Sequence, residues 1–389
     1  MKKAFILSFM VTTLLAVQYI QARESLDGIL KPYLSKYELP ALAAAVVKKG
    51  EIISAGAVGT RKIEANIPVT INDKFHLGSD TKAMTSLLAA MLVEKGKLRW
   101  DSKIGEVFPE AADKMNKDFK NITLTQLLSH TSGIAADNDD FGRILTASCE
   151  WEGNLDEMRY KFLLERGKLP LDRAAGGTFE YSNTNYVIAG AIIERLEGKT
   201  WDELITEKIF YPLELKSAGL GMQGTLGKID APLAHTSENG KIKAILPGPN
   251  SDNLAIIGPA GIAHMSVLDF ARWAGWNAGE GKRKPFLVKA ETMKKLHTPV
   301  ISMPEKKDAA PGTPASGKYA FGWGELSVSW AAHPLVYHGG SNGKNLAHIW
   351  LDTKEDAAIV ITSNISGHKT TEAFYSLAKE LYTKYIKKP

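Results

Sequence analysis

A serine and a lysine three residues apart, Ser79 and Lys82, have the types and spacing for joint chemistry. Apolar residues at helical spacing follow them, so both side chains are expected on one face at the start of a helix. A serine hydroxyl becomes a nucleophile when a nearby base takes its proton. A lysine can be that base where desolvation lowers its pKa, and the unpaired N–H groups of a helix start stabilise the resulting negative charge. The pair therefore favours covalent catalysis by Ser79.

The Ser-x-x-Lys spacing alone is weak, because three other pairs share it: Ser341 with Lys344, Ser366 with Lys369, and Ser376 with Lys379. The pair at 376 falls inside an ordinary amphipathic helix and the pair at 366 in a polar loop, where a solvated surface explains the spacing. Only the pair at Ser79 opens a long, mostly apolar helix that can hold it in a buried cleft. A plain helix start with an exposed lysine is the alternative reading.

The second candidate motif is Tyr181-Ser182-Asn183, which stands just before a predicted helix. It is the sole Tyr-x-Asn in the chain. A tyrosine beside a lysine can shuttle protons, because a nearby cation favours the phenolate. An asparagine amide can hold both a lysine and a substrate carbonyl. On local grounds, a turn capped by Ser182 or Asn183 explains the triplet equally well.

The third candidate motif, His338-Gly339-Gly340-Ser341, ends a predicted strand. Glycines there let a substrate backbone approach closely, and the N–H group of Ser341 can point into a cleft. The His-x-Gly pattern is weak, since His76-Leu77-Gly78 also fits it. For His338 considered alone, a partly buried structural role is the better reading.

The predicted secondary-structure elements that must position these motifs begin with a helix over residues 24–37 and a hairpin of strands 42–47 and 52–58. Residues from about 98 to 284 show helices and long loops, and a helix over 372–386 closes the chain. Late strands are predicted at 319–328, 335–337, 346–351 and 357–362. Short links between successive strands imply antiparallel pairing. The prediction is an α+β fold, with an antiparallel sheet flanked by amino- and carboxy-terminal helices.

A mostly helical domain is expected to interrupt that sheet. The sheet part takes in residues 23–80 and 290–389, and the helical part residues 81–289. Residues 1–22 read as a secretory signal peptide, because Lys2 and Lys3 precede an apolar run too short to span a membrane comfortably and a small residue, Ala22, follows. We therefore expect a secreted or periplasmic protein with no stable membrane span after cleavage, a retained anchor being the alternative.

Composition narrows the function class further. The net charge of +5, with 44% hydrophobic and 23% charged residues, is that of an ordinary globular protein and predicts no nucleic-acid binding. The single cysteine, Cys149, excludes an internal disulfide.

Taken together, the three motifs Ser79-x-x-Lys82, Tyr181-x-Asn183 and His338-x-Gly340 resemble those of the serine β-lactamase-like hydrolases. This family includes class C β-lactamases, DD-peptidases, D-aminopeptidases and related family VIII-type esterases. The resemblance extends over most of the chain after the signal peptide. Further segments that look like family signatures are LLSHTSG at 127–133, YSNTNY at 181–186, PL at 212–213 and PAG at 259–261.

This resemblance implies that Ser79 is the acylated nucleophile, and that Lys82 and Tyr181 share the general-base role before protonating the leaving group. It implies that Asn183 orients Lys82 and the substrate, and that the N–H groups of Ser79 and Ser341 form an oxyanion hole. Tyr181 is then the expected base for the deacylating water. No metal or organic cofactor is implied, and the partner is a small ester, amide or peptide substrate.

The chain departs from the family pattern at the third motif, where His338-Gly339-Gly340 replaces the Lys-Thr-Gly of class C β-lactamases and many penicillin-binding proteins. A neutral histidine anchors a substrate carboxylate more weakly than a lysine does. The change favours an esterase or a D-amino-acid peptidase with weak β-lactamase activity.

Two other readings compete with this one. Residues 339–343 fit Gly-x-Ser-x-Gly around Ser341, the nucleophile elbow of α/β-hydrolases, and Asp352 or Asp356 and then His368 follow in the required order. That elbow joins a strand to a helix in a parallel sheet, whereas here strands are predicted on both sides. The other reading is a protein that binds penicillin or cell wall without turnover.

Overall fold

The computed structural model describes residues 24–136, 138–248, 251–307, 309 and 312–387. The expected signal peptide, residues 1–22, lies outside this part of the chain. Among the described residues, none of the helices combines the length and the apolar composition that a membrane crossing requires.

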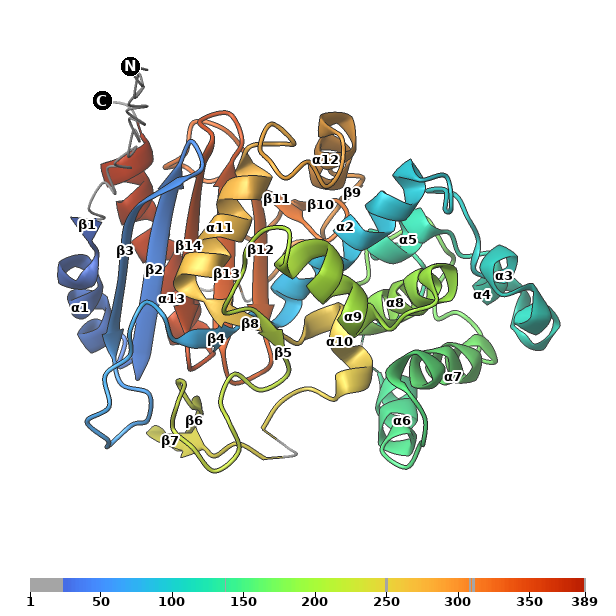
Figure 1. The fold of residues 1–389 in the computed structure, drawn as a ribbon, viewed down its shortest axis with the longest axis horizontal. Helices are drawn as coiled ribbons and strands as arrows, with labels where there is room; N and C mark the ends of the chain where they lie inside the picture. Colours follow the sequence, from blue (N-terminus) through green and yellow to red (C-terminus); the bar gives the residue numbers. More distant parts are fainter. Residues whose placement is uncertain (1–23, 137, 249–250, 308, 310–311, 388–389) are drawn as a thin grey trace, which may run out of the picture.

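A nine-stranded sheet occupies one half of the molecule (Figure 1). Its strand order is β1-β3-β2-β14-β13-β12-β11-β10-β9, and each neighbouring pair is antiparallel except β1 with β3. The strands are β1 (Glu24–Ser25), β2 (Ala41–Lys48), β3 (Glu51–Gly59), β9 (Ile301–Ser302), β10 (Lys318–Tyr319), β11 (Gly324–Leu326), β12 (Leu335–Ser341), β13 (Leu346–Asp352) and β14 (Ala357–Ser363). The predicted α+β fold with a mainly antiparallel sheet is confirmed.

Strand β2 lies inside this sheet, between β3 and β14, and is buried on both faces. Alternate residues point to opposite sides of a strand, so Ala43 and Ala45 join one hydrophobic core while Leu42 and Val46 join another. The turn to β3 is made by Lys49 and Gly50, whose φ angles of 53° and 84° suit a tight hairpin.

Three helices cover the two faces of the sheet. Helix α11 (Val267–Ala278) packs on one face, and α1 (Asp27–Lys36) and α13 (His368–Leu381) pack on the other (Figure 1). Helix α11 falls within the range expected for the helical part, yet it packs on the sheet. Helix α13 starts four residues earlier than predicted, and a π-helical turn, Tyr382–Ile386, completes its carboxyl end.

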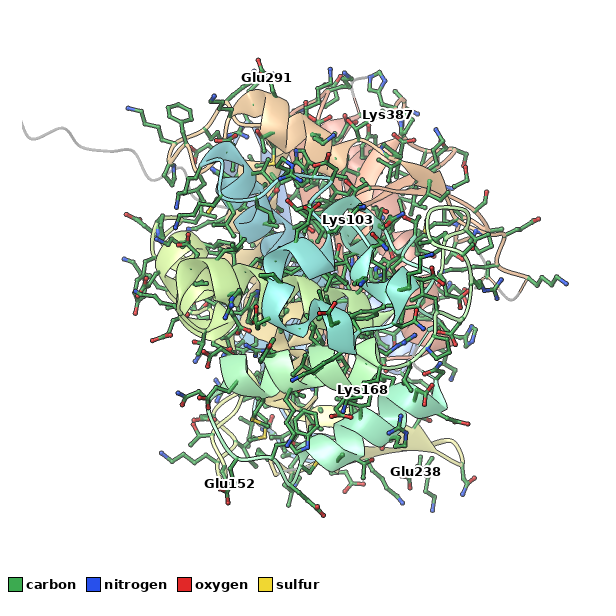
Figure 2. The ribbon with its side chains drawn as sticks, turned by 90° about the vertical axis from the view of Figure 1, so that its right-hand side faces the viewer. Lys103, Glu152, Lys168, Glu238, Glu291 and Lys387 are labelled. Atoms are coloured by element: carbon green, nitrogen blue, oxygen red, sulfur yellow. The ribbon has the colours of Figure 1, made fainter. Side chains whose placement is uncertain are left out.

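The other half of the molecule is mainly helical (Figure 1). Besides α1, α11 and α13, the α-helices of the described residues are α2 (Thr81–Glu94), α3 (Ile104–Val107), α4 (Lys117–Lys120), α5 (Leu124–Leu128), α6 (Asp139–Ser148), α7 (Leu155–Gly167), α8 (Asn183–Glu197), α9 (Trp201–Ile205), α10 (Gly258–Gly261) and α12 (Ala290–His297). Figure 2 looks onto this half from outside, where exposed charged residues such as Lys103 and Lys168 lie on its surface. Helix α2, by contrast, is buried along nearly all its length.

Two small sheets complete the fold: a three-stranded one of β4 (Lys74–His76), β8 (Ala263–Ser266) and β5 (Gly219–Leu220), and the hairpin of β6 (Ala234–Glu238) and β7 (Lys241–Ile245). Strand β4 leads into the start of α2, and β8 follows α10. Their antiparallel pairing therefore brings these two helix ends together.

Candidate active site

Ser79 lies in a short 3₁₀ turn, Gly78–Asp80, directly before α2. The turn is fixed from both sides, because Leu77 N–H donates to Ala263 O at 2.8 Å and Thr81 Oγ1–H donates to Gly78 O at 2.7 Å. Ser79 is partly exposed and lines a cavity of about 490 Å³. Its hydroxyl is therefore both held in place and open to a small molecule.

The Lys82 side chain is fully buried beneath Ser79. Its Nζ lies 3.0 Å from Ser79 Oγ, 2.7 Å from Asn183 Oδ1 and 2.7 Å from Ala260 O. Burying an ammonium group costs much free energy unless polar partners surround it, and these oxygens are such partners. The alternative of an exposed lysine at a plain helix start is excluded.

Tyr181 and Asn183 meet this lysine from the start of α8. The Tyr181 ring centroid lies 4.8 Å from Lys82 Nζ, and the ring packs at 4.2 Å on the imidazole of His130. His130 Nδ1 accepts the Ser182 N–H at 3.2 Å, which ties the two segments together. Burial, with the positive charge of Lys82, lowers the pKa of His130 well below its ordinary value. The imidazole is thus a neutral platform for Tyr181.

His338 lies within β12, which continues to Ser341 rather than ending at Tyr337 as predicted. Its Nε2 lies 3.0 Å from Tyr319 Oη, and its Nδ1 lies 3.3 Å from Asp80 Oδ1. Burial, with the charge of Lys82, lowers the pKa of His338 to about 3, so it is neutral at pH 7. Burial also raises the pKa of Asp80 well above its ordinary range, although Lys82 opposes that shift. His338 therefore brings no positive charge to the cavity.

Gly340 allows β12 to approach the Ser79 turn closely. A Cβ atom on Gly340 would lie 1.9 Å from Leu77 O and 2.8 Å from Ser79 N. A Cβ atom on Gly78 would lie 2.3 Å from Ser341 N. Two residues without side chains thus bring the backbones of Ser79 and Ser341 together. Among the described residues, β11 pairs with β12 only as far as Tyr337, so the edge from His338 onwards faces the cavity.

The sequence-predicted site residues therefore gather in one place. The cavity is lined by Ser79, Tyr181, Asn183, His338 and Ser341, with Lys82 beneath Ser79 and Gly340 against its backbone. Sequence reasoning did not assign functions to four further residues at the site, namely Asp80, His130, Ala260 and Tyr319. His130 and Ala260 lie in two segments that resemble family signatures, residues 127–133 and 259–261, but the resemblance suggests no chemical role for either residue. No sequence pattern points to a role for Asp80 or Tyr319.

The competing nucleophile elbow at Ser341 does not have the required architecture. Strand β13 follows β12 directly, where an α/β-hydrolase would have a helix. Ser341 Oγ accepts the Gly343 N–H at 2.9 Å, and Asp352 Oδ2 accepts the Tyr382 hydroxyl at 2.6 Å. These contacts belong to turns and to the core.

Comparison with known proteins gives a family match over most of the chain. The profile of the family described as Beta-lactamase matches residues 26–381. Protein flp of Staphylococcus aureus (strain MW2) is 23% identical over 345 residues, which cover 89% of this chain and 64% of that protein. Penicillin-binding protein 4 of Amycolatopsis lactamdurans is 26% identical over 351 residues, covering 89% and 86%. The chain thus spans about 64% of the length of protein flp.

Solved structures show the same fold. The octameric penicillin-binding protein homologue from Pyrococcus abyssi superposes with a TM-score of 0.72 at 24% identity, covering 92% of this chain and 76% of that one. A D-stereospecific amidohydrolase from Streptomyces sp. superposes with a TM-score of 0.64 at 20% identity, covering 86% and 93%. At these identities the likeness is one of fold.

Proposed function

The chain belongs to the Beta-lactamase family, and on that premise we propose that it is a serine hydrolase that cleaves small esters or amides through an acyl-enzyme on Ser79. The observation that carries the proposal is the 3.0 Å contact between Ser79 Oγ and the fully buried Nζ of Lys82. This contact holds an amine within hydrogen-bond reach of the hydroxyl, as a general base requires in order to take its proton.

In the proposed reaction, Ser79 Oγ attacks the substrate carbonyl carbon while its proton passes to Lys82, with Tyr181 sharing the base role. The carbonyl oxygen becomes an oxyanion held by the N–H groups of Ser79 and Ser341, each worth about 3 to 4 kcal/mol in the transition state. The carbon–oxygen or carbon–nitrogen bond breaks, and the leaving group takes the transferred proton. Water, deprotonated by Tyr181, then attacks the acyl-enzyme and frees Ser79.

Neutral esters and amides suit the part of the cavity beside His338, whereas exposed Lys306 provides a cation on the same lining. His338, which stands at the motif position where class C β-lactamases and many penicillin-binding proteins carry lysine, is buried and uncharged at pH 7, so it offers no ion pair to a carboxylate. This supports esterase or D-amino-acid peptidase activity, with weak β-lactamase activity at most, and the fold shared with a D-stereospecific amidohydrolase agrees with it. The apolar run within residues 1–22 supports export to the periplasm or medium, which we propose as the location.

Mass spectrometry of the protein incubated with a p-nitrophenyl ester, a penicillin and a D-alanyl peptide tests the proposal. We expect an ester adduct on Ser79 that forms quickly and clears, and no adduct in Ser79→Ala. Ser376→Ala is the matched control, because Ser376 begins another Ser-x-x-Lys pair, within α13. An adduct on Ser341 would contradict the assignment. An adduct on Ser79 that never clears would favour the non-catalytic binding protein.

A further inference from the structure

A histidine and an aspartate lie buried together behind the Ser79 turn, and the proposed reaction uses neither. His76 Nε2 lies 2.9 Å from Asp252 Oδ1, and only 0% and 8% of the two side chains are exposed. His76 ends strand β4, whereas Asp252 belongs to the long segment between β7 and α10. Burying a carboxylate costs free energy, so its location here calls for a physical reason.

One arm of this pair reaches the nucleophile turn. The Gly78 N–H donates to His76 Nδ1 at 3.0 Å. Because Nδ1 accepts a hydrogen bond, a neutral imidazole carries its proton on Nε2, facing Asp252. The carboxylate thus selects the tautomer that holds Gly78. Gly78 has a φ of 52° and directly precedes the Ser79 N–H, so this bond restrains the peptide that presents it.

The other arm reaches the end of β12 from the same carboxylate oxygen. Asn342 Nδ2 donates to Asp252 Oδ1 at 3.0 Å. Asn342 Oδ1 in turn accepts the N–H groups of Lys344 at 3.3 Å and Asn345 at 2.9 Å, which closes the turn between β12 and β13. Asn342 directly follows Ser341. The carboxylate therefore also restrains the strand end that presents the Ser341 N–H.

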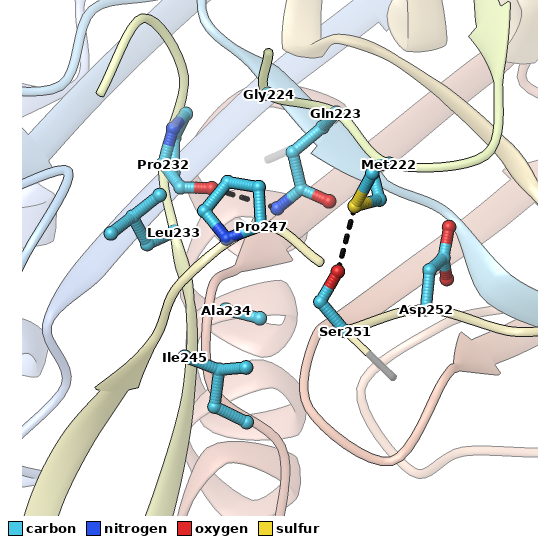
Figure 3. A pocket seen from close by; sticks show the side chains of 10 residues that line it. All are labelled: Met222, Gln223, Gly224, Pro232, Leu233, Ala234, Ile245, Pro247, Ser251 and Asp252. Carbon is cyan, nitrogen blue, oxygen red and sulfur yellow. Dashed lines mark hydrogen bonds between the residues drawn. The ribbon is translucent and has the colours of Figure 1, made fainter. Parts of the chain in front are cut away.

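The segment that carries Asp252 is itself well anchored (Figure 3). Ser251 Oγ accepts the Gly248 N–H at 3.0 Å and lies 2.7 Å from Met222 Sδ. Gln223 Nε2 donates to Pro232 O at 2.8 Å and to Asn345 Oδ1 at 3.0 Å. The cavity between these residues is only about 20 Å³, room for about one water molecule. Asp252 thus stands on a packed support.

We propose that Asp252 is a positioning residue that aligns the two halves of the oxyanion hole, Ser79 through His76 and Ser341 through Asn342. The inference rests on the proposed function. Each N–H must lie about 2.7 to 3.1 Å from the developing oxyanion. A displacement of about 1 Å can cost about 100-fold in rate. The two groups come from distant parts of the chain, so a shared anchor fixes their relative placement.

The charge of Asp252 agrees with this role. Burial raises the pKa of this carboxyl, but its contacts with His76 and Asn342 outweigh that effect and hold the pKa below its ordinary value. The group is therefore an anion at neutral pH and can accept from both partners.

The test compares Asp252→Ala and Asp252→Asn with the unsubstituted protein. Asp230→Asn is the matched control, because Asp230 is an exposed carboxylate in the segment between β5 and β6 that accepts hydrogen bonds from Thr225 rather than from His76 or Asn342. The readouts are the rate of Ser79 acylation by p-nitrophenyl acetate, followed by mass spectrometry, with kcat, KM and Tm. Both acylation and deacylation pass through an oxyanion, so Asp252→Ala should lower kcat about 10- to 100-fold while KM changes less than about threefold. Asp252→Asn keeps one acceptor oxygen and should recover part of the loss, and Asp230→Asn should show none.

Acylation by Asp252→Ala within twofold of the parent rate, or a loss confined to KM, would overturn the positioning role alone. If Asp252→Ala does not fold, Asn342→Ala tests the Ser341 arm, where a tenfold loss supports the role and the parent rate overturns it. Absence of an adduct on Ser79 in the unsubstituted protein would instead overturn the proposed function together with this inference.

Discussion

Lys82 has no exposed surface, and this separates it from lysines at the same spacing elsewhere in the chain. Lys379 is exposed on α13, and 71% of the Lys369 side chain is exposed, where it pairs with Glu38. The burial of Lys82 against Ser79, rather than the spacing itself, therefore distinguishes this pair from the others.

Replacing Lys82 with methionine tests this at the residue scale. Lys82→Met keeps a long apolar stem but removes the group that we propose takes the Ser79 proton, and general-base catalysis is worth about 10²- to 10⁴-fold. We expect labelling of Ser79 by a fluorophosphonate to slow by at least about 100-fold, with far-UV circular dichroism unchanged. Lys379→Met should label at the parent rate. Near-normal labelling of Lys82→Met would show that another group activates Ser79.

At the scale of elements, local sequence predicted what local physics decides. The hairpin of β2 and β3 and the amphipathic closing helix follow from side-chain period and turn residues, which act over a few positions. The end of β12 was missed because its last residues pair with β13 on one side and face the Ser79 turn on the other. The contact between Lys82 and Ala260 joins residues 178 positions apart, and no local pattern encodes it. Only the resemblance to a family brought such segments together in advance.

The approach of β12 to the Ser79 turn gives a prediction at this scale. In Gly340→Ala the new methyl group would overlap Leu77 O and crowd Ser79 N, so the strand edge must move away from the turn. Because the proposed oxyanion hole needs both backbones, we expect kcat/KM for p-nitrophenyl acetate to fall at least about 100-fold. Gly142→Ala in α6, where nothing lies within 4 Å of the added Cβ atom, is the control. Equal activity in the two variants would argue against the close contact.

Over the whole molecule, segments from both ends of the chain build the sheet against which the site is assembled. Strand β2 pairs with β14, and both lie between α11 and the terminal helices. The core so formed also encloses ionisable groups that the proposed reaction does not use, among them His348 on β13, whose ring packs against Trp350, Phe374 and Tyr375. Stability and pH are therefore coupled through the fold as well as through the site.

Buried neutral histidines predict that acid destabilises the protein from about pH 6.5 downwards. Burial lowers the pKa to about 4 for His264 and to about 3 for His338 and His348, with smaller contributions from nearby charges. An unfolded chain binds these protons near pH 6.5, so between pH 6.5 and the folded pKa the unfolded state holds more protons and the free energy of unfolding falls as pH falls. Asp80, with its raised pKa, acts in the opposite sense.

His348→Gln isolates one of these contributions. Each such histidine should lower the free energy of unfolding by about 2 kcal/mol between pH 7 and pH 5. The contribution arises between pH 6.5 and pH 5, an interval of roughly 1.5 pH units, and each pH unit contributes about 1.4 kcal/mol. Urea unfolding at the two pH values should show a loss smaller by that amount in His348→Gln than in the parent. His333→Gln, at an exposed position, should keep the parent loss. An unchanged pH dependence in His348→Gln would mean that His348 takes up its proton as readily in the folded protein as in the unfolded chain.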